Sequence, residues 1–184
     1  MIELQDNDLL FAKVRPNAII PTKDDENAGY DIYANFDEDY LIIPPHKTVL
    51  VPTGIASAVS DKYYLQVHER GSTGSKGIKY SAGVVDSSYR GEIFIALTNA
   101  NNVEVVISKF TKYDFIQENE LGHLVAKRFG DFDYDTAIMY PYTKAIAQLV
   151  VHEVPKMNIK EITYDELKKI PSKRGIGALG SSGK

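Results

Sequence analysis

The sequence predicts an all-β domain, in the form of an antiparallel barrel or sandwich. Its short runs rich in Val, Ile, Leu, Phe and Tyr, the residues favoured in strands, are 9–14, 40–43, 48–51, 63–68, 92–97, 103–107 and 146–154. Turn-forming sequences such as Arg15-Pro16-Asn17 and Pro52-Thr53-Gly54 separate many of them. Because these runs do not alternate with helical patterns, a parallel βα architecture is disfavoured.

One helix is predicted near the C-terminus. Thr163-Tyr164-Asp165-Glu166 fits a capping box, in which the Thr hydroxyl and the Glu carboxylate accept hydrogen bonds from free amides, and Pro171 ends the helix. Residues 172–184 carry too little apolar bulk to fold alone. We therefore expect a β domain over residues 1–171 and a flexible, glycine-rich arm over residues 172–184. Within the domain, residues 108–142 show no clean period and are interpreted as an insertion.

Composition excludes several functional classes. The chain has 184 residues, a formal net charge of -4 and no cysteine. An acidic chain lacks the basic face that nucleic-acid backbones require, and a chain without cysteine has neither thiolate metal sites nor a thiol nucleophile. No apolar run approaches the roughly 20 residues that cross a bilayer, and the N-terminus lacks a secretory pattern. The expected protein is cytoplasmic, with neither a membrane nor a nucleic acid as partner.

A small-residue segment, Arg70-Gly71-Ser72-Thr73-Gly74-Ser75-Lys76-Gly77-Ile78, follows a predicted strand. Small residues allow backbone amides to approach an anion, while the hydroxyl and basic side chains add donors and charge. The alternative is an ordinary Gly/Ser turn. The segment is not a Walker A loop, because it lacks Gly-Lys-Ser/Thr.

Two further segments place a carboxylate in or beside a strand. Gly83-Val84-Val85-Asp86-Ser87-Ser88-Tyr89-Arg90-Gly91-Glu92 reads as a hairpin that presents a candidate base, Asp86, and a flat aromatic surface, Tyr89. The alternatives are turn capping for the acid and a core position for the aromatic. Asp31, in Ala28-Gly29-Tyr30-Asp31-Ile32-Tyr33-Ala34, could equally be a surface residue of a strand.

The C-terminal Gly175-Ile176-Gly177-Ala178-Leu179-Gly180 matches G-x-G-x-x-G, but no helix can follow it before the sequence given ends. A dinucleotide fold is therefore rejected. The remaining interpretations are a disordered tail or an arm that orders over a polyphosphate.

Taken together and in this order, these segments resemble the motifs of the trimeric dUTPase family. Residues 28–34, 70–78 and 83–92 are similar to its first three motifs, Ile146–Val150 to its fourth and Arg174–Gly183 to its glycine-rich fifth. The match spans nearly the whole chain. An insertion between the third and fourth motifs is typical of phage members, in some of which it contacts regulatory proteins.

The resemblance implies jelly-roll subunits that form a homotrimer with active sites at the subunit interfaces. It implies hydrolysis of dUTP to dUMP and pyrophosphate with Mg²⁺, by attack of water on the α-phosphorus. Asp86 would be the general base and Asp31 would hold Mg²⁺ through water. The substrate would be bound by Arg70, Gly71, Ser72, Thr73, Ala82, Gly83, Val84, Tyr89, Gln148, Arg174, Leu179, Gly180, Ser181 and Ser182.

Some positions depart from the family pattern. Gly71 stands where the second motif usually has Ser, and Thr143-Lys144-Ala145 stands where the fourth usually has Gly-Asp-Arg. Leu179 replaces the Phe that covers the base in many members, and Phe94 is the candidate aromatic for that role.

Two other functions stay open at this point. A non-catalytic relative could act as a regulatory protein through residues 108–142. A dCTP deaminase shares the fold but needs a catalytic Glu, and Ala96 stands at that position. The four histidines show no ligand spacing, so no transition metal held by the protein is expected.

Overall fold

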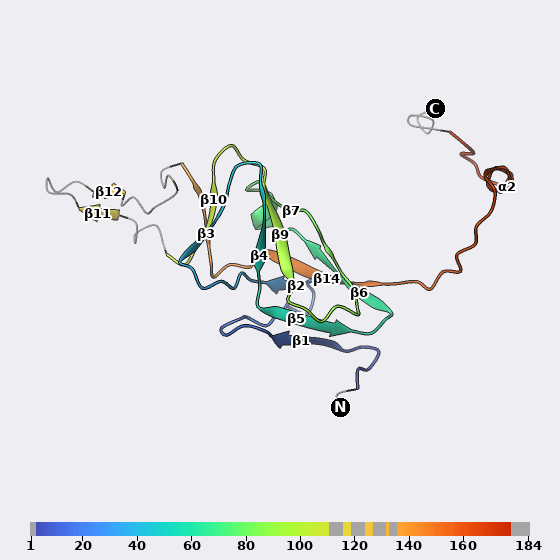
Figure 1. The fold of residues 1–184 in the computed structure, drawn as a ribbon, viewed down its shortest axis with the longest axis horizontal. Coiled ribbons are helices and arrows are strands. Elements are labelled where there is room, and N and C mark those ends of the chain that lie inside the picture. The colour runs from blue at the N-terminus through green and yellow to red at the C-terminus, as the bar shows by residue number, and fades with distance from the viewer. Residues whose placement is uncertain (1–2, 111–115, 119–123, 127–131, 133–135, 178–184) are drawn as a thin grey trace. The chain divides into compact units, whose positions relative to one another are not determined.

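The computed structural model describes residues 3–110, 116–118, 124–126, 132 and 136–177. The chain divides into two compact units, Met1–Val154 and Pro155–Lys184, each considered by itself below. The first unit is built of strands and confirms the all-β prediction (Figure 1). Its elements are β1 (Leu9–Lys13), β2 (Gly29–Ile32), β3 (Tyr40–Ile43), β4 (Thr48–Pro52), β5 (Ile55–Val59), β6 (Tyr63–His68), α1 (Gly71–Gly74), β7 (Ile78–Tyr80), β8 (Val84–Val85), β9 (Phe94–Asn99), β10 (Val105–Ser108), β11 (Ile116–Glu118), β12 (Leu124–Ala126), β13 (Ile138–Pro141) and β14 (Ala147–Glu153).

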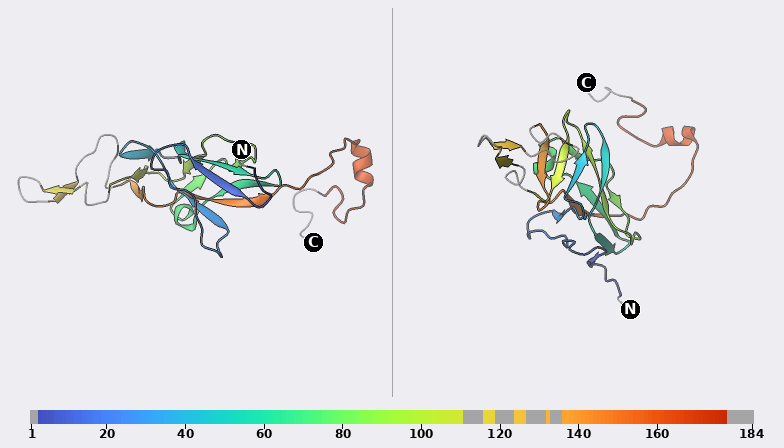
Figure 2. Two further views of the ribbon diagram at one scale, coloured as in Figure 1. Left: turned by 90° about the horizontal axis from the view of Figure 1, so that it is seen from below. Right: turned by 60° about the vertical axis from the view of Figure 1, so that its left-hand side comes forward.

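The strands form small sheets, and two of these sheets carry the features of interest. One has the order β2-β14-β6-β8 and the other β4-β9-β7. The remaining sheets are β1-β5, β13-β10-β3 and β11-β12. Figure 2 shows the same strands from two other directions. Within the part of the chain that the structure describes, the strands pair in antiparallel fashion except β10 and β13, which are parallel.

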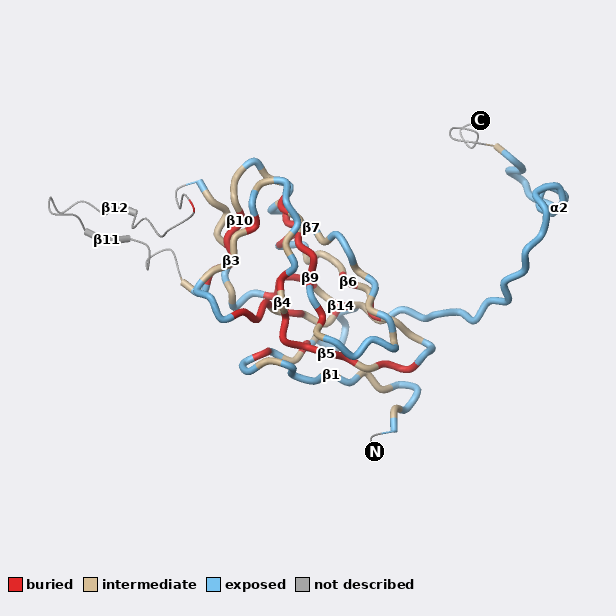
Figure 3. Tube along the Cα trace, in the orientation of Figure 1, coloured by how far each residue is buried: buried red, intermediate tan, exposed pale blue. Residues whose placement is uncertain are grey.

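Alternation along β14 decides which side chains reach the surface. Ala147 and Leu149 are buried, whereas Gln148 and Val150 between them are only partly covered. Successive side chains on a strand point to opposite faces, so the first pair faces the core and the second lies on the outer face of the sheet. The main core contains apolar side chains from the β2-β14-β6-β8 and β4-β9-β7 sheets, including Ile32, Leu65, Val67, Ile95, Leu97 and Leu149. The buried stretches of the tube in Figure 3 run through β5, β9 and β10.

The predicted insertion has its base on the first unit. Its return strand, β13, pairs with β10, and the Tyr142 amide donates to the Ser108 carbonyl at 2.7 Å. Phe132 is buried against Val106, and its ring meets that of Tyr40 edge to face at 5.1 Å. Strands β11 and β12 pair with each other in antiparallel fashion. The two ends of residues 108–142 are thus fixed side by side.

The second unit contains α2 (Tyr164–Lys169), which confirms the predicted helix. The Glu166 amide donates to the Thr163 hydroxyl at 3.2 Å, and the Thr163 amide donates to the Glu166 carboxylate at 2.8 Å. The backbone and hydroxyl of Thr163 hold the pKa of Glu166 below its usual value, because they donate to its ionised form. No residue of α2 is buried. Neither helix in the described part of the chain is long and apolar enough to cross a membrane.

Candidate active site

An ion pair between Arg70 and Asp31 lies in an open pocket of the described residues. The Arg70 Nε and Nη2 atoms donate to the two carboxylate oxygens of Asp31 at 2.8 and 3.0 Å. Both side chains remain about one third exposed, at 31% and 30%. A bidentate guanidinium–carboxylate pair fixes the plane of the guanidinium. The pocket has a volume of about 650 Å³, which is within the range of small-molecule sites.

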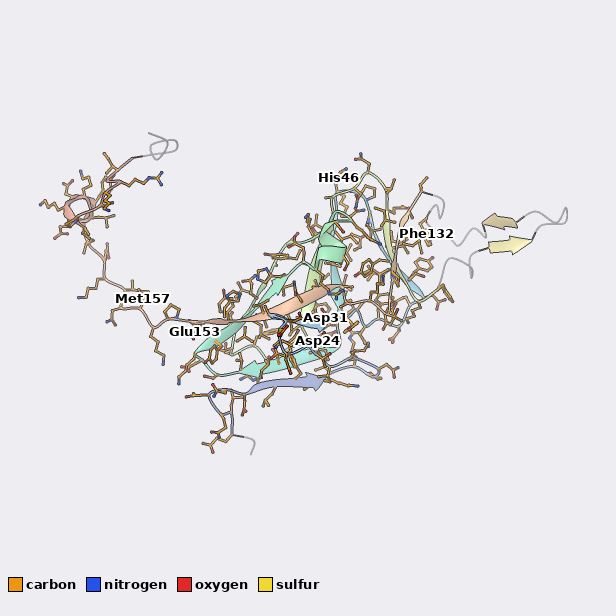
Figure 4. All side chains as sticks on the ribbon, turned by 180° about the vertical axis from the view of Figure 1, so that it is seen from behind. Asp24, Asp31, His46, Phe132, Glu153 and Met157 are labelled. Carbon is orange, nitrogen blue, oxygen red and sulfur yellow. The ribbon has the colours of Figure 1, made fainter. Side chains whose placement is uncertain are left out.

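Strand register brings the predicted polar residues to this pocket. Gln148 on β14 lies opposite Asp31 on β2 and opposite His68 on β6. Partners in register share one face of a sheet, so the first and fourth predicted motifs meet there. Arg70 follows β6 and therefore emerges beside them. Figure 4 shows Asp31 with Asp24, another residue of the pocket lining.

Gln148 is held in place by its neighbours. Its side-chain amide donates to the Glu69 carbonyl at 2.8 Å, just before Arg70. A Cβ atom on Gly29 would come within 2.9 Å of Gln148 Cβ and Cδ. Position 29 must therefore lack a side chain for the glutamine to cross the strand and line the pocket.

The small-residue segment forms one helical turn, α1, rather than an irregular loop. Thr73 creates this turn, because its hydroxyl accepts from the Arg70 amide and donates to the Arg70 carbonyl, both at 3.0 Å. Gly71 and Ser72 line the pocket, whereas the Thr73 side chain is buried beneath the turn. The Arg70 Nη1 group lies 3.4 Å from the Ser72 hydroxyl. In this structure Thr73 contacts the backbone of the predicted phosphate-binding segment.

A second pocket is formed by the loop between β8 and β9. This segment was predicted to be a hairpin, but the prediction is wrong: β8 pairs with β6, and β9 pairs with β4 and β7, so the loop connects two different sheets. Asp86, Tyr89 and Phe94 line it together with Val84. Its volume of about 260 Å³ is below the roughly 300–1,000 Å³ that is usual for a small-molecule site. It shares no lining residue with the Arg70 pocket. Within one chain, the candidate base and the candidate phosphate-binding residues therefore occupy separate surfaces.

The Tyr89 ring lies over Gly91. A Cβ atom at position 91 would be 2.5 Å from the phenol oxygen, so this packing requires glycine. The phenol donates to the Glu92 carbonyl at 2.9 Å, and the Tyr89 amide donates to the Asp86 carbonyl at 3.0 Å. Asp86 itself is exposed. The loop thus presents an exposed carboxylate beside an aromatic ring of fixed orientation.

The other predicted site residues lie either beside β8 in the first unit or in the C-terminal segment. Ala82 is exposed, and the Gly83 carbonyl accepts from the Val67 amide at 2.7 Å where β8 joins β6. Arg174 is in the second unit, where its Nε atom donates to the Gly177 carbonyl at 3.1 Å. The predicted residues Leu179, Gly180, Ser181 and Ser182 lie outside the described residues.

Sequence reasoning missed part of the Arg70 pocket. One wall is the segment before β2, and its residues Thr22, Lys23, Asp24 and Asn27 line the pocket. In the sequence, this segment is typical of a polar surface loop. In the structure, the bridge between Thr22 and Asp31 brings it beside the pocket. Among the described residues no three His, Asp or Glu side chains form a group that could hold a metal.

Comparison with known proteins decides the family. The family model described as dUTPase matches residues 15–113, more than half of the chain. The chain belongs to the dUTPase family. The deoxyuridine 5'-triphosphate nucleotidohydrolase of Debaryomyces hansenii is similar at 34% identity, over 91% of this dUTPase and 82% of the relative. The enzyme of the same name from Mycobacterium marinum is 29% identical over 96% of both chains. Membership places the chain among the dUTP diphosphatases.

Solved structures support the fold of this dUTPase. The dUTPase of Staphylococcus bacteriophage 80alpha, in a mutant form with dUpNHpp, covers 96% of this chain and 98% of its own, with a TM-score of 0.69 and 21% identity. The dUTPase of phage phi11 of S. aureus, a structure that visualises a species-specific insert, covers 85% of this chain with a TM-score of 0.62 and 20% identity. Identities this low show the shared fold alone.

Proposed function

We propose that this dUTPase hydrolyses dUTP to dUMP and pyrophosphate at a site composed of the Arg70 pocket of one subunit and the Asp86 pocket of its neighbour in a homotrimer. The observation that carries the proposal is the separation of these residues within one chain. Family resemblance assigns them to one reaction, yet they line pockets with no residue in common. A homotrimer with closed symmetry would account for the separation, because every subunit interface can then place the Arg70 pocket of one chain against the Asp86 pocket of the next.

The Arg70 pocket is the phosphate half of the proposed site. Arg70 offers charge, Gly71 and Ser72 offer an approachable backbone and a hydroxyl, and Gln148 lines the same pocket. Fixed donors of this kind stabilise charge that develops on phosphate oxygens without reorganising during the reaction. Thr73 contributes indirectly in this proposal, because its hydroxyl shapes the turn that carries Arg70.

The Asp86 pocket is the nucleoside half. The Asp86 carboxylate takes a proton from a water molecule as its oxygen bonds to the α-phosphorus, and the bond from that phosphorus to the bridging oxygen breaks to release pyrophosphate. Tyr89 packs under the sugar and leaves no room for a 2′-hydroxyl. We assign the reading of the uracil edge to Ala82, Gly83 and Val84. Phe94, which lines the pocket with Val84, is the candidate to cover the base in place of the family phenylalanine.

The residues of the phosphate half fit Mg²⁺. The Asp31 carboxylate is a hard oxygen donor, about 30% exposed, and each of its oxygens keeps a lone pair beyond the one used by Arg70. Magnesium prefers such ligands, keeps several of its waters and binds mainly through substrate phosphates. Asp31 would hold it through water, and the bound ion would neutralise charge on the triphosphate. A mutant of phage phi11 dUTPase was solved to show coordination of a structural Mg(II) ion.

The C-terminal arm closes the proposed site. We assign this role to residues 172–184, with Arg174, Leu179, Gly180, Ser181 and Ser182 contacting the bound nucleotide. Closure of such a segment excludes water and fixes the triphosphate for in-line attack. We propose that residues 108–142 form an insertion that packs at its base on its own subunit; contact of this insertion with a regulatory protein is the alternative.

Pyrophosphate release from matched nucleotides tests the proposed function. We expect release from dUTP in the presence of Mg²⁺, strong reduction with EDTA, and little release from UTP, dCTP or dTTP at equal concentration. Absence of release from every nucleotide would contradict hydrolysis and favour the regulatory alternative. Ammonia release from dCTP would instead indicate a deaminase, although the position that should carry its glutamate is the buried Ala96 of β9.

A further inference from the structure

The Glu92 side chain anchors the end of the loop that carries Asp86 and Tyr89. Arg15 Nε donates to both of its carboxylate oxygens, at 2.9 and 3.0 Å, and the Gly54 amide donates to one of them at 2.9 Å. The Glu92 side chain is 14% exposed and lines the same pocket as Asp86. These contacts join the loop to two segments distant from it in sequence.

A second general base is not the best interpretation of Glu92. Both of its oxygens accept hydrogen bonds from the protein, one of them from two donors. The Glu92 carboxylate is thus directed at Arg15 and Gly54 rather than at the pocket opening, whereas the Asp86 side chain is exposed. Glu92 is therefore better placed to position other groups than to react.

The anchor at Gly54 is rigid. Gly54 has a φ of 68°, and a Cβ atom there would lie 2.8 Å from Ala18 Cβ, so the turn fits tightly against its surroundings. Next to the contact with Glu92, the Ile93 amide donates to the Ile55 carbonyl at 2.7 Å, and the Thr53 hydroxyl donates to the Ile93 carbonyl at 2.6 Å. One end of the loop between β8 and β9 is thereby fixed to the buried turn between β4 and β5.

Glu92 also connects directly to the sugar-binding surface. Its carbonyl accepts the Tyr89 phenol, and Gly91 beside it underlies the ring. The other end of the loop is fixed where β8 pairs with β6. A rotation of the backbone at Glu92 would consequently move the Tyr89 ring and change its distance from a bound sugar.

We propose that the Arg15–Glu92 ion pair is a positioning device that sets the selectivity for deoxyribose over ribose by fixing the Tyr89 ring and, with it, the Asp86 loop. The proposal rests on the proposed function, in which Tyr89 excludes the 2′-hydroxyl. Displacements on the order of 1 Å at such contacts cost large factors in rate, so a pair that does not touch substrate can control specificity.

The test compares dUTP with UTP in variants that break the pair. In Arg15→Met and Glu92→Gln we expect kcat/KM for dUTP to fall about tenfold and the ratio of kcat/KM for dUTP over UTP to fall by a similar factor. Glu92→Gln retains an acceptor for the Gly54 amide, so it removes the charge with little change in shape. In the double variant, kcat/KM for dUTP and the dUTP-to-UTP ratio should equal those of the more impaired single variant, because all three variants lose the same interaction. Arg15→Lys should recover part of the selectivity.

The matched control is Lys62→Met, which breaks the exposed ion pair with Asp6 and should leave both kcat/KM values unchanged. Thermal unfolding of every variant separates selectivity from stability. Variants that are less stable but keep the wild-type ratio of dUTP to UTP would overturn the positioning role. If Glu92→Gln does not fold, the Arg15 variants still test the positioning role. The Arg15 side chain is 39% exposed, so its replacement should be tolerated by the fold. A wild-type protein that does not cleave dUTP would refute the proposed function itself, which is a distinct result.

Discussion

Replacing Asp86 by Asn is expected to lower the turnover of dUTP about 1,000-fold, within the range that general-base catalysis contributes. The amide has the shape of the carboxylate but cannot take a proton from water. The fold should not suffer, because the side chain is exposed and the hydrogen bond within the loop is accepted by the Asp86 backbone carbonyl, which the substitution keeps. Pyrophosphate release measures the turnover, and calorimetry with a non-hydrolysable dUTP analogue should show nearly unchanged affinity.

Ser88→Ala is the control for that experiment, since Ser88 lies exposed in the same loop and has no role in the proposed chemistry. It should retain wild-type turnover. Undiminished turnover in Asp86→Asn would rule out Asp86 as the base. A large loss of analogue affinity would mean that this side chain binds substrate rather than activating water.

Replacing Arg70 by Gln is expected to reduce kcat/KM for dUTP about 100-fold, the scale associated with losing one fixed donor to a developing charge. The variant also releases Asp31 from its bidentate partner. Arg70→Lys should restore little, because an ammonium group cannot reproduce the planar two-pronged contact. Steady-state kinetics and analogue binding measure the two effects.

Lys79→Gln removes a positive charge from β7, outside the pocket lining, and provides the matched control. Its kinetics should resemble those of the wild type. Equal losses in the Lys79 and Arg70 variants would indicate a general effect of net charge. Unchanged analogue affinity in Arg70→Gln would contradict the assignment of this pocket to the phosphates.

Local patterns were sufficient to predict much of the fold. Strands β3 and β6 have the predicted bounds, Tyr40–Ile43 and Tyr63–His68, because apolar and turn-forming residues delimit them clearly. Helix α2 was predicted from its capping box, which is a purely local signal. For α1 the sequence left open an ordinary Gly/Ser turn but did not predict a helical one, since Gly and Ser residues favour loops and the hydroxyl of Thr73 decides the conformation.

Contacts between distant segments account for what the sequence could not show. Nothing near Asp31 indicates that it lies opposite Gln148, and nothing near Glu92 indicates Arg15 as its partner. The parallel pairing of β10 with β13 at the base of the insertion also depends on register across a long connection. Family resemblance supplied the roles of Asp86 and Arg70, but only the structure places them in separate pockets of one chain.

The most direct test of a site shared between subunits mixes two inactive chains. Asp86→Asn and Arg70→Gln proteins, dissociated and reassembled together at equal amounts, should form trimers in which roughly a quarter of the sites combine an intact Asp86 with an intact Arg70 from another chain. We predict that dUTP hydrolysis recovers to about that fraction of the wild-type rate, while either variant reassembled alone keeps its own much lower rate. Failure of the mixture to exceed the separate variants, with mixed trimers demonstrated by mass spectrometry, would show that both residues act within one subunit and would contradict the proposed site.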